Sequence, residues 1–307
     1  MGAGGVGGHY GALLARAAHD VTFVARGAHL AALQAHGLEL RIGEQRLHMN
    51  PVQAVESPAG LGSADSIDLV LFTVKTYDTA AAIELLRPAV GPNTAVLTLQ
   101  NGVDSTQHLA AAFGSQRVIA GTTVMTSAVV APGVIEAAPG RMVVLAELSG
   151  APTPRLEHIA AALRDVGVDV AIVTDARVAV WEKFVLLASL ATLTSACGLS
   201  VGPVRDEAEA ATVLRGLIAE ATRVGRACGV PLPAEVEEVA WAKIAAAPGW
   251  ARTSMQLDFE AQHRAELEEL TGTVVRLGRA HAVPTPRFEV LYALLKVRLQ
   301  TFAARRA

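Results

Sequence analysis

The sequence predicts an α/β domain built on a parallel sheet, followed by an all-helical domain. Two observations predict this fold class. Gly2, Gly4 and Gly7 fit the pattern G-x-G-x-x-G, the turn of a Rossmann-type domain that sets a dinucleotide pyrophosphate on a helix N-terminus. Strand-like apolar runs alternate with helical segments up to residue 174, and the chain beyond has helical periodicity. We therefore expect a Rossmann-like NADP-type nucleotide domain over residues 1–174 and a helical domain over residues 175–307.

The glycine turn lies at the start of the chain. Glycines there allow a tight turn and let the backbone approach phosphates closely. The cofactor is expected to contact the backbone of Gly2, Gly4, Gly5, Val6 and Gly7. A strand normally precedes this turn, but only Met1 does so here. The first strand is therefore missing from the chain as given, and we expect Met1 to be an internal residue of a longer natural sequence.

The missing strand would be central in the strand order 3-2-1-4-5-6, between strands expected at residues 21–25 and 67–74. Neighbouring strands lie about 4.8 Å apart, so we expect these two strands to be about 10 Å apart. We also expect unpaired backbone groups between them, weak cofactor binding and reduced stability.

The other elements of the first domain follow from local patterns. Short β-branched and apolar runs predict strands, and longer segments of helical composition predict helices. The expected strands are residues 21–25, 38–42, 45–49, 67–74, 94–99 and 169–173, the second and third forming a hairpin. The expected helices are residues 7–18, 28–35, 79–86 and 153–164. Between residues 118 and 145, β-rich pieces are expected to extend the sheet as antiparallel strands.

Three residues follow the carboxyl ends of expected strands, where ligands of open α/β sheets bind. Arg26 stands where an acidic residue would bind the 2′-hydroxyl of NAD, and an arginine can hold the 2′-phosphate of NADP. The sequence therefore favours NADP, the alternative being a solvated Arg26. Lys75 and Asn101 are candidate ligand contacts, or else a strand end that reaches water and an ordinary Asn-Gly turn.

The composition is that of a chain with large apolar cores. Hydrophobic residues make up 51% and charged residues 18%, and the net charge is −3. This excludes a basic surface for nucleic acid and gives no reason to expect binding to an anionic membrane. The two cysteines are too few for a disulfide framework and indicate a cytoplasmic protein. Residues 184–204 carry no charge, but their hydroxyls and glycines favour a core helix over a membrane span.

The first helix of the second domain carries an ammonium group in an apolar segment. Glu182 and Lys183 are the charged residues of 178–188. A buried ammonium is costly unless it is paired, reaches solvent or is used in chemistry. Lys183 is therefore either a residue that reaches solvent beside Glu182, or a lysine in a cleft between domains. In the second case, desolvation lowers its pKa and it gives a proton to a substrate oxygen.

A second polar set lies later in the helical domain. Ser254 is interpreted as a helix cap whose hydroxyl could alternatively bind a carboxylate. Glu266, Glu268 and Glu269 are most simply a solvated helix face. The histidines and cysteines show no metal-ligand spacing, so no metal is expected.

Taken in order, these motifs resemble the ketopantoate reductase (2-dehydropantoate 2-reductase) family over essentially the whole chain. In the first domain the matches are Gly-Ala-Gly-Gly-Val-Gly-Gly at 2–8, Val-Ala-Arg-Gly at 24–27, Val-Lys-Thr-Tyr-Asp at 74–78 and Gln-Asn-Gly-Val at 100–103. In the second they are Trp-Glu-Lys-Phe at 181–184, Ser-Met-x-x-Asp at 254–258, and Glu266.

The resemblance implies NADPH-dependent reduction of the 2-oxo group of ketopantoate to pantoate, on the route to pantothenate and coenzyme A. It implies that Lys183 is the general acid and that Glu266 orients the lysine and the substrate hydroxyl. It further implies that Asn101 binds substrate beside the nicotinamide and that Ser254 binds the substrate carboxylate.

The resemblance also assigns Arg26 and Lys75 to the cofactor, NADPH. It leaves a homodimer open, because the sequence does not determine the oligomeric state.

The chain departs from the family pattern in three places. The family helix usually carries asparagines four and eight positions after its lysine, where this chain has Leu187 and Ala191. A threonine expected before Glu266 is Ala265. These changes make the expected substrate pocket more apolar. Two alternatives follow, a paralogue that reduces a different, more apolar oxo acid and a non-catalytic NADPH-binding or sensing protein. Retention of Lys183 together with Glu266 favours an enzyme.

Overall fold

The computed structural model describes residues 1–61 and 66–304, and divides into two compact units. The first unit contains Met1–Gln100 and Asp104–Ala176, and the second contains Asn101–Val103 and Arg177–Ala307. A three-residue segment of the N-terminal half therefore belongs to the helical unit. The domain boundary expected between residues 174 and 175 stays a prediction.

The main sheet of the first unit has the strand order β11-β10-β7-β6-β5. Its strands are β5 (Leu69–Phe72), β6 (Ala95–Thr98), β7 (Val118–Val124), β10 (Met142–Glu147) and β11 (Asp169–Ile172). Strands β5, β6 and β7 are parallel, β10 is antiparallel to β7, and β11 is parallel to β10. Beside this sheet, β1 (Thr22–Val24) pairs in parallel with β4 (Gln53–Val55).

Residues 1–3 lie between β1 and β5, at the position that strand 1 has in the expected order. The amino group of Met1 donates to Leu71 O at 2.8 Å, and Thr73 N donates to Met1 O at 3.0 Å. Gly2 N and Ala3 N both donate to Val24 O. The strand order 3-2-1-4-5-6 is therefore confirmed, with Met1 at position 1. The expectation of unpaired groups is wrong for these atoms, because residues 1–3 bridge the two strands.

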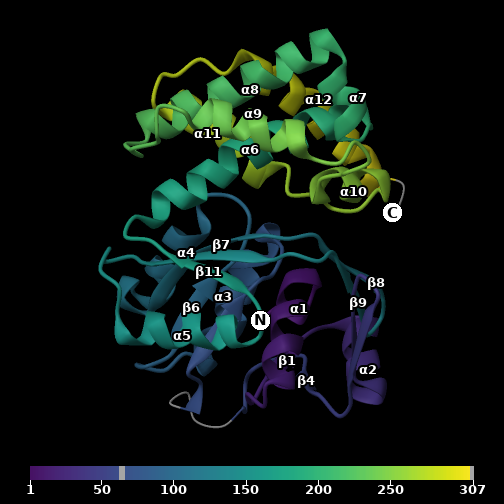
Figure 1. Ribbon diagram of the computed structural model, residues 1–307, viewed down its shortest axis with the longest axis vertical. Helices are drawn as coiled ribbons and strands as arrows, with labels where there is room; N and C mark the ends of the chain where they lie inside the picture. The colour runs from purple at the N-terminus through teal and green to yellow at the C-terminus, as the bar shows by residue number, and fades with distance from the viewer. Residues whose placement is uncertain (62–65, 305–307) are drawn as a thin grey trace. The chain divides into compact units, whose positions relative to one another are not determined.

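Helices cover both faces of the main sheet (Figure 1). They are α1 (Gly5–Arg16), α3 (Thr79–Leu86), α4 (Ser105–Phe113) and α5 (Pro154–Asp165), whereas α2 (Gly27–His36) packs against β4. Short 3₁₀ turns lie at η2 (Thr76–Asp78), η3 (Arg87–Ala89) and η4 (Ser115–Arg117). Successive strand residues point to opposite faces. Leu97 of β6 thus joins the core beneath α1 and α5, whereas its neighbour Val96 joins the core beneath α3 and α4.

A second sheet in the first unit has the order β3-β2-β9-β8. Its strands are β2 (Leu38–Ile42), β3 (Gln45–Met49), β8 (Ser127–Ala131) and β9 (Val134–Ala137). The hairpin of β2 and β3 is confirmed. The expectation that all β-rich pieces between residues 118 and 145 extend the main sheet is wrong for β8 and β9. β9 pairs with β2 of the hairpin and β8 pairs with β9, and the buried Ile135 of β9 packs on α1, where Gly8 leaves room for it.

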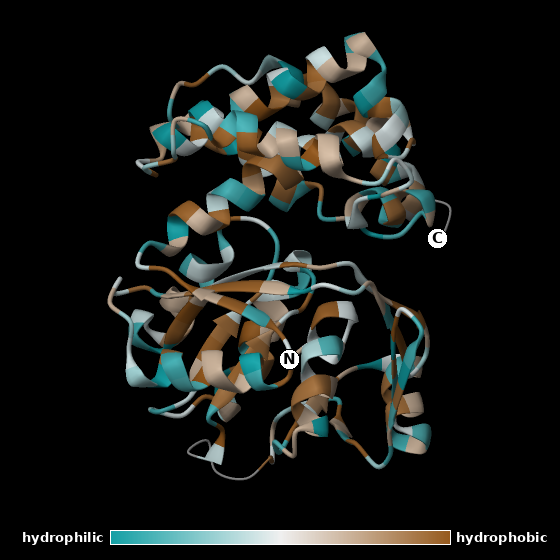
Figure 2. Cartoon of the chain, in the orientation of Figure 1, coloured by the Kyte–Doolittle hydropathy of each residue, from teal (hydrophilic) through white to brown (hydrophobic). Residues whose placement is uncertain are grey.

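The second unit is all-helical, as expected. Its elements are α6 (Ala176–Cys197), α7 (Val201–Asp206), α8 (Ala208–Ala227), α9 (Val236–Ala246), α10 (Ser254–Glu260), the π-helical turn η5 (Glu268–Gly272), α11 (Thr273–Ala280) and α12 (Pro286–Ala304). Buried apolar residues of these helices form one core, and Figure 2 shows apolar and polar residues interspersed along their ribbons.

Helix α6 is the core helix of the second unit. By length and composition alone it could cross a membrane, but 61% of its apolar window is buried by the rest of the chain. Its hydroxyl groups bond to carbonyls one turn back, Ser189 Oγ to Val185 O at 2.7 Å and Thr194 Oγ1 to Leu190 O at 2.8 Å. These features are those of a buried helix in a globular unit.

Candidate active site

The glycines of the first turn have different structural roles. Gly2 has a φ of +88°, in the left-handed region that favours glycine. A Cβ on Gly7 would collide with the Thr73 hydroxyl and the Gly2 carbonyl, so α1 approaches β5 only without a side chain. A Cβ on Gly4 would meet no atom within 4 Å. The open side of Gly4 is therefore where a ligand can approach the backbone.

The N-terminus of α1 has the chemistry of an anion site. Gly4 is its N-cap, no side chain caps the helix, and its first turn holds no acidic residue. The Ser127 hydroxyl donates to Gly5 O at 2.9 Å and ties the turn to β8. Helix N-termini present N–H groups and a partial positive charge to anions. The residues present therefore fit the pyrophosphate of a dinucleotide.

Arg26 and Lys75 lie at the carboxyl ends of β1 and β5, as expected. Arg26 is the N-cap residue of α2, and its side chain is 79% exposed. Its guanidinium forms an ion pair with Asp78, at the end of η2. Lys75 precedes η2 and is half-buried. Two cationic side chains thus lie near the strand ends of the first unit, and that of Arg26 pairs with the carboxylate of Asp78.

Three side chains of the second unit form a hydrogen-bonded chain. Lys183 Nζ on α6 donates to Asn101 Oδ1 at 3.0 Å. Asn101 Nδ2 in turn donates to Glu266 Oε2 at 3.1 Å. The amide of Asn101 is thereby oriented by both charged groups, with its oxygen toward the ammonium and its nitrogen toward the carboxylate. An ammonium, an amide and a carboxylate together can position a carbonyl compound and give it a proton.

The elements around these residues explain their positions. Lys183 lies in the second turn of α6, between the buried side chains of Trp181 and Phe184. Gly102 has a φ of +86°, and a Cβ there would lie 3.3 Å from Glu269 O. A glycine thus lets the loop that carries Asn101 pack against the start of η5, two residues beyond Glu266.

Burial changes the acidity of two groups in this region. Desolvation lowers the pKa of Lys183 to about 8, and the nearby carboxylate of Glu266 opposes the shift. Desolvation raises the pKa of Glu269, and the negative charge of Glu266 adds to that effect. The lowered pKa of Lys183 agrees with the interpretation of a desolvated lysine rather than one that reaches solvent beside Glu182.

The structure separates the three acidic residues that the sequence grouped together. Glu266 is only 3% exposed, so the solvated-face interpretation is wrong for it. Glu268 is exposed and bonds with Tyr292 and Lys296. Glu266 lies before the π-helical turn that starts at Glu268, and residues two positions apart on a helical segment do not face the same side.

The helix-cap interpretation of Ser254 is wrong. The N-cap of α10 is Thr253, whose hydroxyl accepts from Gln256 N at 3.3 Å. Ser254 is the first residue of the helix and is exposed. Within the part of the chain that the structure describes, its hydroxyl makes no hydrogen bond to Lys183, Asn101 or Glu266. Its role toward a carboxylate stays a prediction.

The apolar replacements lie on and beside α6. Leu187 is half-buried one turn beyond Lys183, and Ala191 is fully buried one turn further. Ala265 is 5% exposed beside Glu266. Each of the three side chains is apolar and carries no hydrogen-bonding group.

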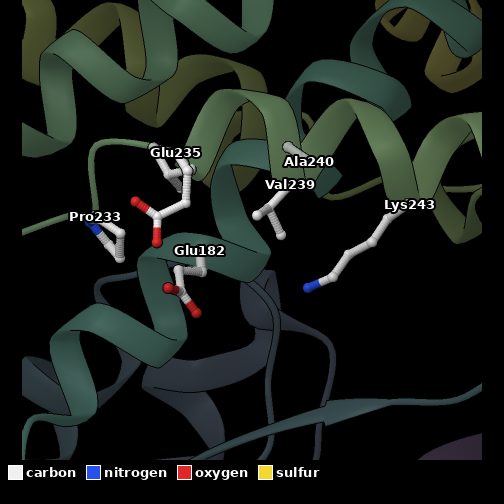
Figure 3. Close-up of a pocket in the computed structure, with 7 residues that line it drawn as sticks. Glu182, Pro233, Glu235, Val239, Ala240 and Lys243 are labelled. Carbon is white, nitrogen blue, oxygen red and sulfur yellow. The ribbon is translucent and has the colours of Figure 1, made fainter.

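Figure 3 shows a small pocket elsewhere on the second unit. Its lining residues are Glu182, Pro233, Glu235, Val236, Val239, Ala240 and Lys243. None of these residues belongs to the predicted site. The candidate site is therefore defined by the hydrogen bonds of Lys183, Asn101 and Glu266 rather than by this pocket.

Among residues 1–61 and 66–304, no cluster of histidine, cysteine or acidic side chains could hold a metal ion. Sequence reasoning missed two features of the site regions. Asp78, the partner of Arg26, lies beyond the end of β5, which residues 1–3 separate from β1, and the sheet topology could have indicated it. Glu269 was grouped with a solvated face although burial raises its pKa.

Comparison with known proteins gives matches over both units. Residues 1–150 match the family model described as ketopantoate reductase PanE/ApbA, and residues 175–299 match the model of its C-terminal domain. A 2-dehydropantoate 2-reductase of Mesorhizobium japonicum is 30% identical, over 96% of this chain and 95% of that protein.

Solved structures agree. The crystal structure of a PanE/ApbA family ketopantoate reductase from Ralstonia eutropha has a TM-score of 0.89 and 32% identity, and the match covers 99% of this chain and 98% of that one. A ternary structure of D-mandelate dehydrogenase with NADH and anilino(oxo)acetate has a TM-score of 0.90, 18% identity and 98% coverage of both chains. At that identity the second match shows the fold alone.

Proposed function

This chain belongs to the ketopantoate reductase PanE/ApbA family of NADPH-dependent oxidoreductases, and on that premise we propose its reaction and its catalytic residues. The reaction is the reduction of the 2-oxo group of a 2-oxo acid, with 2-dehydropantoate as the first candidate substrate. The product would then be pantoate, made in the cytoplasm for pantothenate and coenzyme A. The observation that carries the proposal is the hydrogen-bonded chain of Lys183, Asn101 and Glu266.

The cofactor would be held by the first unit. The backbone of residues 2–7 at the N-terminus of α1 binds the pyrophosphate, since Gly4 leaves the approach open. Arg26 binds the 2′-phosphate, and Lys75 contributes positive charge at the neighbouring strand end. NADPH held there would supply the hydride for reduction of the substrate carbonyl.

Lys183 acts as the general acid. When hydride reaches a carbonyl carbon, negative charge develops on the oxygen, and a cationic N–H donor stabilises that charge as it forms. The ammonium then gives its proton to the oxygen and leaves a hydroxyl group. Its pKa of about 8 suits this task, because a donor is most effective when its pKa lies near the working pH.

Asn101 and Glu266 position the acid and the substrate. The amide of Asn101 holds the ammonium at 3.0 Å and is itself held by Glu266. The carboxylate of Glu266 also favours the charged form of Lys183 and therefore limits the fall of its pKa. Ser254, exposed at the start of α10, is proposed to bind the substrate carboxylate.

A second candidate substrate class is favoured by Leu187 and Ala191. Their apolar side chains would leave the hydrogen-bonding groups of a polar substrate tail unpaired, at about 1–3 kcal/mol for each group. A more apolar 2-oxo or 3-oxo acid avoids this cost. A non-catalytic NADPH-binding protein is disfavoured, because it would have no use for an ammonium desolvated beside a buried carboxylate.

The test is NADPH oxidation by the purified protein with a panel of oxo acids that includes 2-dehydropantoate and acids with longer alkyl or aromatic tails. We expect turnover with at least one of them, and the order of kcat/KM identifies the substrate class. Binding of NADPH without oxidation on any member of the panel would contradict the proposal and favour a sensing role.

A further inference from the structure

We propose that Asp78 limits the preference of this protein for NADPH over NADH, because its carboxylate competes with the 2′-phosphate for the guanidinium of Arg26. The inference rests on the proposed function, in which Arg26 binds that phosphate. It concerns a residue that is neither in the glycine turn nor in the catalytic chain.

The geometry of the ion pair carries the inference. Arg26 follows β1 and Asp78 closes η2 beyond β5, so the two strand ends hold opposite charges in contact although 52 residues separate them. The Asp78 side chain is 22% exposed, whereas that of Arg26 is 79% exposed. The carboxylate is thus fixed in the protein, and the guanidinium reaches it from the surface.

One guanidinium therefore serves two anions. A phosphate monoester carries about −1.5 to −2 charges at pH 7. Any phosphate bound by Arg26 lies within the span of one guanidinium group from the carboxylate of Asp78. Binding of the phosphate must release Arg26 from Asp78 or keep two like charges close together, and both options weaken the binding of NADPH.

The carboxylate of Asp78 interacts with NADH in a different way. Its ribose carries a 2′-hydroxyl, which donates a hydrogen bond, and an acidic residue at a Rossmann strand end is a suitable acceptor. Asp78 therefore disfavours one cofactor and accommodates the other. Arg26 creates the preference for NADPH over NADH, and Asp78 makes that preference smaller.

The decisive variant is Asp78→Asn, which removes the charge and keeps the shape. The measurement is the Kd of NADPH and of NADH, obtained by titrating protein against the fluorescence of the reduced nicotinamide, with no substrate present. Exposed ion pairs are weak, so we expect NADPH to bind about 2-fold to 5-fold more tightly. NADH should bind equally well or more weakly. The gain for NADPH should shrink as salt rises, because the Debye length falls from about 10 Å at 0.1 M to about 3 Å at 1 M.

The chain offers a matched control. Glu84 and Arg87 on the adjacent helix α3 and η3 form another exposed ion pair at 2.8 Å, so Glu84→Gln removes a comparable charge away from Arg26. It should leave both Kd values unchanged. Thermal unfolding of both variants checks that the fold is kept.

Two results would overturn the inference. Unchanged binding of NADPH by Asp78→Asn would show no competition, and weaker binding would make Asp78 a residue that positions Arg26. Failure of the proposed function has a different signature, since Arg26→Ala would then weaken NADPH and NADH equally.

Discussion

The two candidate regions of this protein are built in different ways. The cofactor region of the first unit consists mainly of backbone, where Gly2, Gly4 and Gly7 set a turn and leave a helix N-terminus open. The catalytic region of the second unit consists of side chains, Lys183, Asn101 and Glu266, whose hydrogen bonds span 82 and 165 residues of sequence. The cofactor region depends on the absence of side chains in a short glycine-rich segment. The catalytic region depends on side chains that the fold brings together from distant parts of the sequence.

This difference determines how each region should respond to mutation. A substitution that adds atoms should disrupt the glycine turn of the cofactor region. A substitution that removes a functional group should disrupt the hydrogen-bonded side chains of the catalytic region. The two kinds of change should also separate cofactor binding from turnover.

The largest expected effect is on the side-chain region. Lys183→Met removes the proposed acid and keeps an unbranched side chain of similar length. We expect kcat to fall by about 10²-fold to 10⁴-fold, which is the usual contribution of general acid catalysis. The Kd of NADPH, measured by fluorescence titration, should change little. Turnover near that of the wild type would remove Lys183 from the mechanism.

The glycine turn offers a matched pair of substitutions. Gly7→Ala places a methyl group against the Thr73 hydroxyl and the Gly2 carbonyl, so we expect a loss of about 1–3 kcal/mol in the free energy of unfolding. Gly4→Ala places the methyl group in open space, and folding should be nearly unaffected. NADPH binding should nevertheless weaken in Gly4→Ala, because the methyl group occupies the approach to the backbone.

Denaturant unfolding and NADPH titration of both variants test this pair. Equal stability losses would contradict the assigned roles of the two glycines. Unchanged NADPH binding by Gly4→Ala would mean that the pyrophosphate lies elsewhere.

A smaller effect is expected from the positioning carboxylate. Glu266→Gln keeps the shape but removes the charge that favours protonated Lys183. We expect a fall in kcat of about tenfold and a further decrease in the pKa of Lys183. The pH profile distinguishes this role from a structural one, since its alkaline limb should move to lower pH. If the alkaline limb stays at the same pH, the charge of Glu266 does not influence the pKa of Lys183.

The strands and the glycine turn could be predicted from local patterns of apolar residues and glycines, and the strand order followed from the Rossmann topology that the turn indicates. The sequence was insufficient for β8 and β9, since their apolar pattern does not differ from that of β7 and β10 and only packing on α1 separates the two sheets.

Side-chain assignments were less predictable for a related reason. Thr253 and Ser254 both carry hydroxyls, and the position of the cap depends on where the helix starts. The three acids lie within four residues, but Glu266 is buried and bonded to Asn101 whereas Glu268 is exposed. The burial of Glu266 depends on a loop 165 residues away in the sequence, which local spacing does not specify.

The central claim is that the ammonium of Lys183 donates the proton, and the pH dependence of kcat/KM tests it most directly. Burial lowers the pKa of Lys183 to about 8, so the protonated form predominates below that pH and is lost above it. With saturating NADPH and an accepted oxo acid, kcat/KM should be level up to about pH 8 and then fall about tenfold for each further pH unit. A profile that stays level to pH 10 would contradict the account.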